Sequence, residues 1–267
     1  MTRLLHLTDL HFGLHREELV QPLHDAVVAN RPDVVVVSGD LTQRALAWQF
    51  KTAMAFLNGL DLPFMVIPGN HDLPAFNPLA RLLNPFGAYR RGAAQELTPA
   101  LMVGRLRIFG INTADPLQWR GGVARTGQVE QVARALRDTP ADVTNILVCH
   151  HPFEEPLGFE RGETKGARSA TQNLAAAGLH VILSGHLHHW TIGLGISGAV
   201  GRPLFQLQTG TALCSRVGER DHGFCVLDFD SSGLSATRWL IDEQTSKFMP
   251  EPTTAFLWHD EMWFKNR

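Results

Sequence analysis

The hydrophobic and polar positions along the first two-thirds of the chain follow two alternating periods. Short β-branched or apolar runs predict strands, and the run "VVVV" at 34–37 is typical of a strand buried on both faces. Apolar residues at helical spacing predict helices between these runs. One such helix is expected at 17–30, with an apolar face formed by Leu19, Leu23, Val27 and Val28. The alternation predicts βαβ units with parallel strands.

The same patterns give a coarse order of elements. Strands are expected at 3–9, 32–40, 63–72, 107–113, 144–152 and 180–188. Helices are expected at 17–30, 45–60, 127–138 and 167–178. Strands then follow one another without helices at 203–210, 222–230 and 234–242. We interpret the chain as one domain over 1–267, with polar motifs at 9–188, a β-rich tail at 203–241 and a C-terminal extension at 242–267.

Three segments do not fit this alternation. The stretches 73–92 and 152–168 lack strong periodicity, which predicts long loops that cover a functional cleft. The stretch 193–198 matches GxGxxG but is followed by a β-like run, so we interpret it as a glycine-rich loop between strands and not as a dinucleotide site. The aromatic stretch "FLWHDEMWF" near the end is interpreted as a packing or homodimer contact, with binding to a membrane surface as the lesser alternative.

The composition narrows the class of protein. The 267 residues are 44% hydrophobic and carry a formal net charge of −2, which argues against a general electrostatic attraction to nucleic acid or to an anionic membrane. Three scattered cysteines suggest a reducing compartment. Neither a signal peptide nor a membrane-spanning run is recognised, so we expect a cytoplasmic protein.

Polar residues occur at the carboxyl end of five predicted strands. The motifs are "DLH", "GD", "GNHD", "HHP" and "GHLH", and they supply Asp9, His11, Asp40, Asn70, His71, His150, His186 and His188. In open α/β sheets the ligand crevice lies beyond the carboxyl ends of the strands, so these groups should converge there. Imidazole, carboxylate and amide oxygen suit Mn, Fe and Zn. Their number exceeds the roughly four ligands of one zinc ion and suits two metals that share a carboxylate.

Each motif alone has a simpler explanation. "GD" is usually a turn, and Asp9 with His11 could be a helix cap beside a surface histidine. The joint pattern, always at strand ends, favours a metal centre.

The five motifs, in this order, resemble the calcineurin-like metallophosphoesterases. The stretches "LTDLHFG", "VVVSGDLTQRA", "VIPGNHD" and "TGTALCSRVGERDHGF" resemble the bacterial cyclic-nucleotide-phosphodiesterase-like branch. The resemblance covers residues 3–189 by motif, and the β-rich tail also fits. It implies a four-layer α/β/β/α sandwich with mixed sheets.

The resemblance also implies a role for each motif residue. One divalent ion would be held by Asp9, His11 and His188, and the other by Asn70, His150 and His186. Asp40 would bridge the two ions. His71 would not be a ligand; it would face the substrate phosphate as an acid or charge stabiliser, with its orientation fixed by Asp72. The roles of His151 and His189 stay open.

The expected function is hydrolysis of phosphodiester bonds by a metal-activated water, with 3′,5′-cyclic nucleotides as one substrate class. Alternatives are a glycerophosphodiester or phospholipid phosphodiesterase, a general phosphatase, or a non-catalytic scaffold of the same fold. The scaffold is disfavoured because Asp40, Asn70 and His71 are all present. Further substrate contacts are expected from the loop arginines Arg81, Arg90 and Arg91, because guanidinium suits phosphate oxygens.

Overall fold

The structure, a computed structural model, describes residues 1–140, 142–156, 158, 162–197, 203–260 and 262–266. The strands are β1 (Thr2–Leu7), β2 (Val34–Val37), β3 (Phe64–Val66), β4 (Ala100–Val103), β5 (Leu106–Gly110), β6 (Thr144–Val148), β7 (Val181–Ser184), β8 (Thr191–Ser197), β9 (Pro203–Gln208), β10 (Gly223–Phe229), β11 (Gly233–Asp242), β12 (Lys247–Pro250), β13 (Thr254–His259) and β14 (Met262–Lys265). The helices are α1 (Val20–Ala29), α2 (Ala47–Gly59), α3 (Pro78–Leu83), α4 (Gly87–Gly92), α5 (Thr126–Arg137) and α6 (Ala167–Ala176), with short 3-10 turns η1 (Glu17–Leu19) and η2 (Asn70–Asp72).

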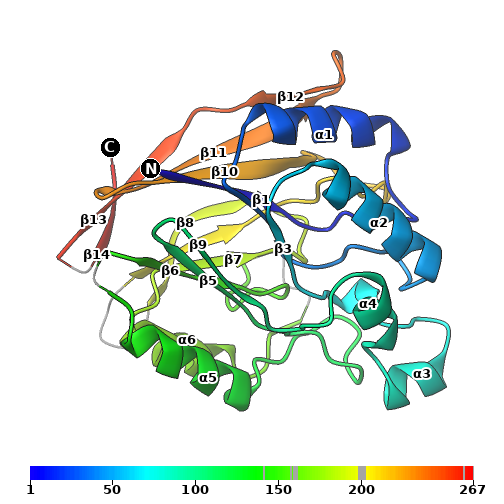
Figure 1. Ribbon diagram of the computed structural model, residues 1–267, viewed down its shortest axis with the longest axis horizontal. Coiled ribbons are helices and arrows are strands. Elements are labelled where there is room, and N and C mark those ends of the chain that lie inside the picture. Colours follow the sequence, from blue (N-terminus) through cyan, green and yellow to red (C-terminus); the bar gives the residue numbers. More distant parts are fainter. Residues whose placement is uncertain (141, 157, 159–161, 198–202, 261, 267) are drawn as a thin grey trace.

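These strands form two mixed sheets. The first has the order β14-β13-β11-β10-β1-β2-β3, with β12 also paired to β11, and the second has the order β4-β5-β6-β7-β9-β8. Figure 1 shows the sheets between two groups of helices, with α1 above them and α5 and α6 below. The C-terminal segment is part of the first sheet, where β13 and β14 form a hairpin against β11.

Three apolar cores separate the four layers. Alternate residues of β2 divide between two of them, because side chains alternate across a strand. Val35 and Val37 pack with α1 and α2, whereas Val34 and Val36 pack between the sheets. The third core joins α5 and α6 to the second sheet. This arrangement confirms the predicted α/β/β/α sandwich and explains why the valine run is apolar throughout.

The expected long loop at 73–92 is wrong in part, because it contains α3 and α4. The start of α3 has a local signal that periodicity missed. Asn77 accepts a hydrogen bond from the Ala80 amide at 2.9 Å, and Pro78 occupies the first turn. Such a cap stabilises a six-residue helix whose leucines are not buried.

Two other expectations differ from the structure. The stretch at 193–198 was expected to be a glycine-rich loop, but residues 193–197 belong to β8, which pairs with β9. Residue 198 lies outside the described residues. Pairing with a neighbouring strand outweighs the weak strand preference of glycine. Val28 lies off the buried face of α1, with 40% of its surface exposed.

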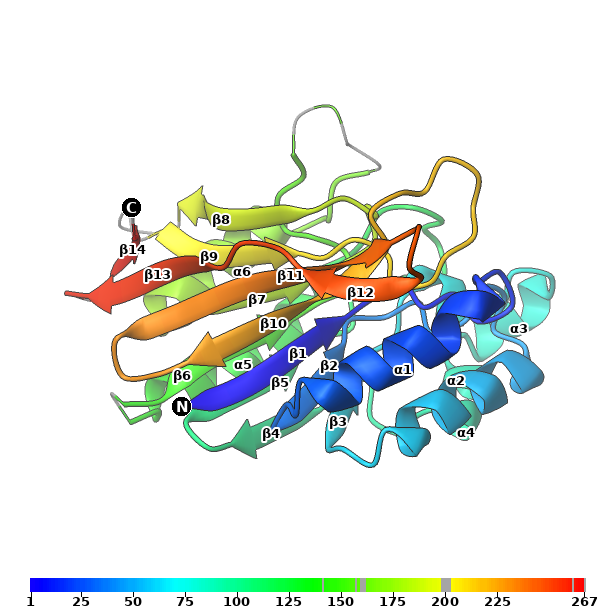
Figure 2. The ribbon, with the colours of Figure 1, turned by 90° about the horizontal axis from the view of Figure 1, so that it is seen from above.

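The carboxyl ends of five strands define one end of the sandwich. β1, β2 and β3 run parallel in the first sheet, as do β6 and β7 in the second. Figure 2 shows β1 running from the N-terminus toward the end of the molecule where α3 lies. None of the helices in the described part of the chain has the length and apolarity needed to cross a bilayer.

Candidate metal centre

The predicted ligands meet at an edge shared by the two sheets. We expected the edge of one open sheet, but β1, β2 and β3 belong to the first sheet, and β6 and β7 to the second. Backbone hydrogen bonds join the loops within each sheet, from the Asp9 amide to the Gly39 carbonyl at 3.1 Å and from the Gly185 amide to the His150 carbonyl at 3.1 Å. Opposed sheets therefore present ligands from two sides.

Two motif glycines allow the loops to approach closely. A Cβ atom on Gly69 would collide with the carboxylate of Asp40, and one on Gly185 would collide with Thr8 and Asp9. The glycines of "GNHD" and "GHLH" thus leave room for carboxylates that come from other strands.

A first cluster lies at the ends of β1 and β7. The Nε2 atoms of His11 and His188 are 3.2 Å apart. Oδ1 of Asp9 lies 3.1 Å from Nε2 of His188 and 3.5 Å from Nε2 of His11. All three side chains are buried. Their donor atoms face one small space, which is the arrangement expected of ligands to one ion.

A second cluster lies at the ends of β3, β6 and β7. Nε2 of His150 is 3.1 Å from Oδ1 of Asn70. The His186 ring lies 5.2 Å from the His150 ring, and its backbone amide donates to Oδ2 of Asp9 at 2.9 Å. His186 therefore lies beside the second cluster while its main chain supports the first.

Asp40 lies between the two clusters. Its Oδ2 atom is 3.6 Å from Nε2 of His11 and 3.4 Å from Nε2 of His150. Its other oxygen accepts a hydrogen bond from the His71 amide at 2.8 Å. One carboxylate oxygen thus faces a histidine of each cluster.

Polar contacts at the far side of two of the rings favour one tautomer. Nδ1 of His150 donates to the Ser38 carbonyl at 2.8 Å, because a carbonyl oxygen can only accept. Nδ1 of His188 lies 2.7 Å from Oε1 of Glu219. The hydrogen bond of His150 and the ion pair of His188 both favour a proton on Nδ1 and leave Nε2 toward the cluster, as for metal-binding histidines.

The charges of the centre are strongly coupled. Burial lowers the pKa of His150, but the Asp40 carboxylate outweighs burial and the pKa rises to about 9. Burial likewise lowers the pKa of His188, and Asp9 reverses this and raises it to about 9. The two carboxylates show the converse: burial raises the pKa of each, and neighbouring histidines bring it well below the ordinary value. Buried anions held by cations in this way suit divalent metals, which compete with the imidazole protons for the same nitrogens.

Five predicted ligands have left-handed backbones. Positive φ angles occur at Asp9 (53°), His11 (48°), Asp40 (51°), His186 (72°) and His188 (53°). Such a conformation is uncommon outside glycine and costs on the order of 1–3 kcal/mol each. Because it recurs at the ligands, the strain is best explained as the requirement of a preorganised site.

His71 lies beside the first cluster, with its ring 4.8 Å from that of His11. Its Nδ1 donates to the Gln43 carbonyl at 3.0 Å. The described hydrogen bonds of Asp72 go elsewhere. Its carboxylate accepts from the amides of Gly69, Leu41 and Thr42. Asp72 thus ties the "GD" loop to the "GNHD" loop, and Gln43 positions the His71 ring.

The three loop arginines have different surroundings. Arg81 is buried, and its guanidinium donates to the carbonyls of Pro74, Pro116 and Gln118. Arg90 and Arg91 are exposed on α4. Arg81 therefore fastens the loop after η2 to the 116–118 segment, whereas the other two are accessible.

His151 also belongs to this region. It is buried, its ring lies 4.5 Å from that of His186, and its Nδ1 is 2.9 Å from Oγ1 of Thr113. Burial brings its pKa well below the usual value and keeps the ring neutral. His189 is only half-buried, and burial lowers its pKa as well.

Sequence reasoning missed the supporting residues from the 209–222 loop. Glu219 contacts His188, and the Thr211 hydroxyl donates to the Asp9 carbonyl at 2.7 Å. The thiol of Cys214 also faces His11 and His188, with the donor atoms within 4.8 Å of one another. The only signal was the stretch "TGTALCSRVGERDHGF", which lies beyond the last ligand motif.

Replacing Glu219 by Gln is expected to weaken Mn²⁺ binding roughly 10–100-fold, the usual effect of removing such a supporting carboxylate. Gln retains the acceptor oxygen but loses the charge that favours binding. Titration of the metal-depleted protein with Mn²⁺ measures the change. Glu17→Gln is the matched control, because Glu17 pairs with His15 at 2.8 Å without touching a predicted ligand. Equal Mn²⁺ affinities of Glu219→Gln and wild type would contradict a supporting role for Glu219.

Known proteins share both the sequence pattern and the fold. The calcineurin-like phosphoesterase profile matches residues 2–190. Glycerophosphodiester phosphodiesterase GpdQ of Enterobacter lignolyticus is 35% identical over 204 residues, 71% of this chain and 72% of that protein. The 3′,5′-cyclic adenosine monophosphate phosphodiesterase CpdA of Escherichia coli K12 is 25% identical over 202 residues, 70% and 69% of the two chains. A further relative, "Probable glycerophosphodiester phosphodiesterase GpdQ" of Arcobacter nitrofigilis, is 27% identical over 57% of this chain and 54% of its own.

Solved structures support the fold alone. Purple acid phosphatase PPD1 of yellow lupin superposes with a TM-score of 0.68 at 16% identity, over 94% of this chain and 53% of that one. GAP50 of Plasmodium gives a TM-score of 0.58 at 15% identity, over 90% and 84% of the two chains. These comparisons confirm the resemblance drawn from the five strand-end motifs, and the relatives include both kinds of diesterase.

Proposed function

The chain belongs to the calcineurin-like phosphoesterase family, a family of hydrolases, and we propose that this member is a dinuclear metal-dependent phosphodiesterase. The observation that carries the proposal is the position of Asp40. One of its oxygens faces His11 at 3.6 Å and His150 at 3.4 Å, at the boundary of two separate ligand clusters. A single-metal site would have no use for the second cluster.

The proposed ligand sets follow the clusters. One ion would be held by Asp9, His11 and His188, the other by Asn70, His150 and His186, and Asp40 would serve both. The donor set suits Mn, Fe or Zn. When bound, two such ions polarise the phosphoryl oxygens and lower the pKa of a water molecule so that it can attack in line.

The protein's own groups orient the substrate and supply a proton. His71 is held by its Nδ1–H bond to the Gln43 carbonyl, so Nε2 is the atom available to the substrate. With Nε2 protonated, the ring donates to a phosphoryl or leaving-group oxygen, a contribution of roughly 10²–10⁴-fold in rate. Asp72 fixes the loop that carries His71 through its backbone partners.

We infer a preference for diesters, with 3′,5′-cyclic nucleotides as the first candidate and glycerophosphodiesters as the second. A monoester dianion carries more charge than a diester and requires additional cations around the phosphate. The neighbours of the ligands within "DLHFG" and "GHLHHW" are aromatic or apolar, and Arg81 is occupied by carbonyls. The similarity to GpdQ supports the second candidate and the similarity to CpdA the first.

The Mn²⁺-loaded protein is expected to hydrolyse bis-p-nitrophenyl phosphate with a higher kcat/KM than p-nitrophenyl phosphate. Parallel assays with 3′,5′-cyclic AMP and a glycerophosphodiester, at equal concentrations, separate the two candidates. Turnover of the glycerophosphodiester without turnover of cyclic AMP would keep the reaction class and discard the cyclic-nucleotide substrate. A monoester kcat/KM above that of every diester would reject the diesterase proposal.

A further inference from the structure

Helix α3 buries its charged side chain and exposes its apolar ones, the reverse of an ordinary surface helix. Its one charged residue, Arg81, is only 6% exposed, while Leu79, Leu82 and Leu83 are 67%, 62% and 72% exposed. A helix on the surface of a globular protein normally buries its apolar side chains and exposes its charges. Here three leucines face outward, although the helix has only six residues.

The exposed apolar side chains continue onto the neighbouring segments. Of the 17 large apolar side chains that are exposed in the described part of the chain, eight belong to residues 41–60, 73–95 and 116–124. They are Leu46, Trp48, Phe76, Leu79, Leu82, Leu83, Leu117 and Trp119. We call the surface of these three segments the α3 surface. Clustered apolar exposure of this kind marks an interaction site more often than scattered residues do.

The α3 surface is locally basic, although the exposed acids Asp61 and Glu96 lie directly beyond two of its segments and Asp115 directly precedes the third. Its three segments contain no Asp or Glu, although the whole chain has 26 acidic residues against 24 Lys and Arg. The exposed cations are Arg44, Lys51, Arg90, Arg91 and Arg120. The net charge of −2 therefore conceals a local basic surface, and the composition argument against anionic membranes does not apply to this part of the molecule.

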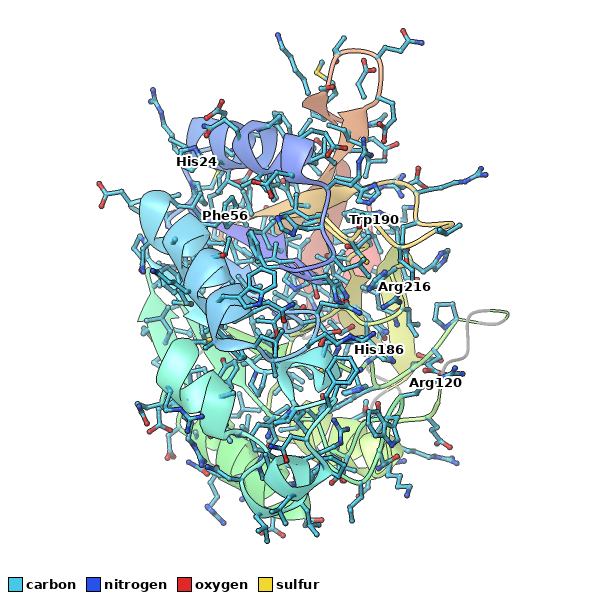
Figure 3. The ribbon with its side chains drawn as sticks, turned by 90° about the vertical axis from the view of Figure 1, so that its right-hand side faces the viewer. His24, Phe56, Arg120, His186, Trp190 and Arg216 are labelled. Carbon is cyan, nitrogen blue, oxygen red and sulfur yellow. The ribbon has the colours of Figure 1, made fainter. Side chains whose placement is uncertain are left out.

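Side-chain contacts make the three segments one surface beside the metal centre. The Arg44 guanidinium lies 4.9 Å from the centre of the Phe76 ring, and Arg81 lies 4.1 Å from the Trp119 ring. The Trp119 carbonyl accepts a hydrogen bond from Nδ2 of the predicted ligand Asn70 at 3.3 Å. Figure 3, which looks onto this end of the molecule, labels Arg120 and His186 in the same part of the view.

We propose that the α3 surface docks reversibly on an anionic lipid bilayer. Leucine and phenylalanine side chains can enter the boundary between headgroups and acyl chains, where tryptophan is also favoured. Arginines around them attract the phosphates of anionic lipids. A nucleic acid would be matched by the cations but not by exposed leucines, and an apolar protein partner would not require this local excess of cations. Docking brings the metal centre close to the membrane surface.

Sedimentation of the full-length protein with vesicles tests this directly. We expect binding to phosphatidylcholine vesicles that contain about one third phosphatidylglycerol, and roughly tenfold weaker binding to phosphatidylcholine alone. Raising NaCl from about 0.1 M to about 0.5 M should release most of the protein, because salt screens exposed charges. Equal binding to both vesicle types, or binding to neither, would overturn the proposal.

The double variant Leu82→Asp/Leu83→Asp is expected to reduce anionic-vesicle binding at least tenfold and to leave hydrolysis of a water-soluble diester unchanged. Met102→Asp/Met249→Asp is the matched control, because these side chains are 55% and 51% exposed on β4 and β12, outside the α3 surface. Phe76→Ser provides a second test if the double variant folds poorly. Vesicle binding equal to that of wild type would refute the proposal. A second result would also refute it: a wild type that binds no vesicles but self-associates on size exclusion with light scattering, and a double variant that no longer self-associates. That result would assign the surface to a protein contact.

Discussion

Asp40→Asn is expected to remove both metal ions together and to lower kcat/KM for every diester by roughly 10³-fold or more. The reason is that one carboxylate oxygen faces His11 and His150 alike, so its charge serves both clusters. Metals supply several kcal/mol to phosphoryl transfer, and each 1.4 kcal/mol corresponds to about tenfold in rate. Elemental analysis after gel filtration measures the metal content, and kinetics on bis-p-nitrophenyl phosphate measure the activity.

Asparagine is the right replacement because Asp40 has a φ of 51°, a conformation that Asn tolerates better than Ala. Its amide oxygen can still accept from the His71 amide. Asp61→Asn is the matched control, since Asp61 has a φ of 52° and is exposed before β3, at the opposite end of that strand from Asn70. A variant that retains one tightly bound ion, with affinity equal to wild type, would show that Asp40 is not shared.

The layered fold and the strand ends were predictable because they depend on local pattern. The valines of β2 form an unbroken apolar run, since the strand lies between two cores. Polar motifs that interrupt such runs at a strand end have few structural reasons to be there. Their meeting point followed from the rule that parallel strands share a carboxyl edge, although the edge belongs to two sheets and not to one.

The partners of the motif residues could not be read from spacing. Glu219 meets His188 across 31 residues of sequence, and Gln43 meets His71 across 28. The resemblance implied that Asp72 fixes the orientation of His71, whereas the described hydrogen bonds of Asp72 go to the amides of the adjoining loops. Arg81 was expected at the substrate for its charge, whereas its guanidinium is taken up by carbonyls that no local pattern reveals.

The α3 surface is a different kind of miss. Leu79, Leu82 and Leu83 lie at helical spacing, but six residues are too few for periodicity to distinguish a helix from a loop. A pattern that violates the usual rule is read as a loop, and the violation itself carries functional information. The net charge of the whole chain did not reveal the basic segments, because acidic residues elsewhere cancel their charge in the sum.

His71→Ala is expected to lower kcat on diesters by roughly 10²–10⁴-fold while the metal content stays near that of wild type. The His71 ring bonds to Gln43 through Nδ1, packs against the His11 ring and has a nitrogen within 4.8 Å of donor atoms of His11 and Asp40, while its backbone amide donates to Asp40 and is kept in the variant. Removing the ring therefore removes a proton donor and leaves the ligand clusters in place. A larger effect on diesters with a poor leaving group, such as an alkoxide, than on p-nitrophenyl diesters would identify His71 as the acid, because a good leaving group needs no proton.

The control is His24→Ala, a half-buried histidine on α1 whose label in Figure 3 lies well away from that of His186. It is expected to retain full activity, which excludes a general effect of losing an imidazole. Loss of one metal ion from His71→Ala, measured by elemental analysis, would make His71 a ligand and overturn its assignment. Full metal content with unchanged kcat on both classes of leaving group would remove it from the reaction altogether, and the charge of the transition state would then have to be met by the metals alone.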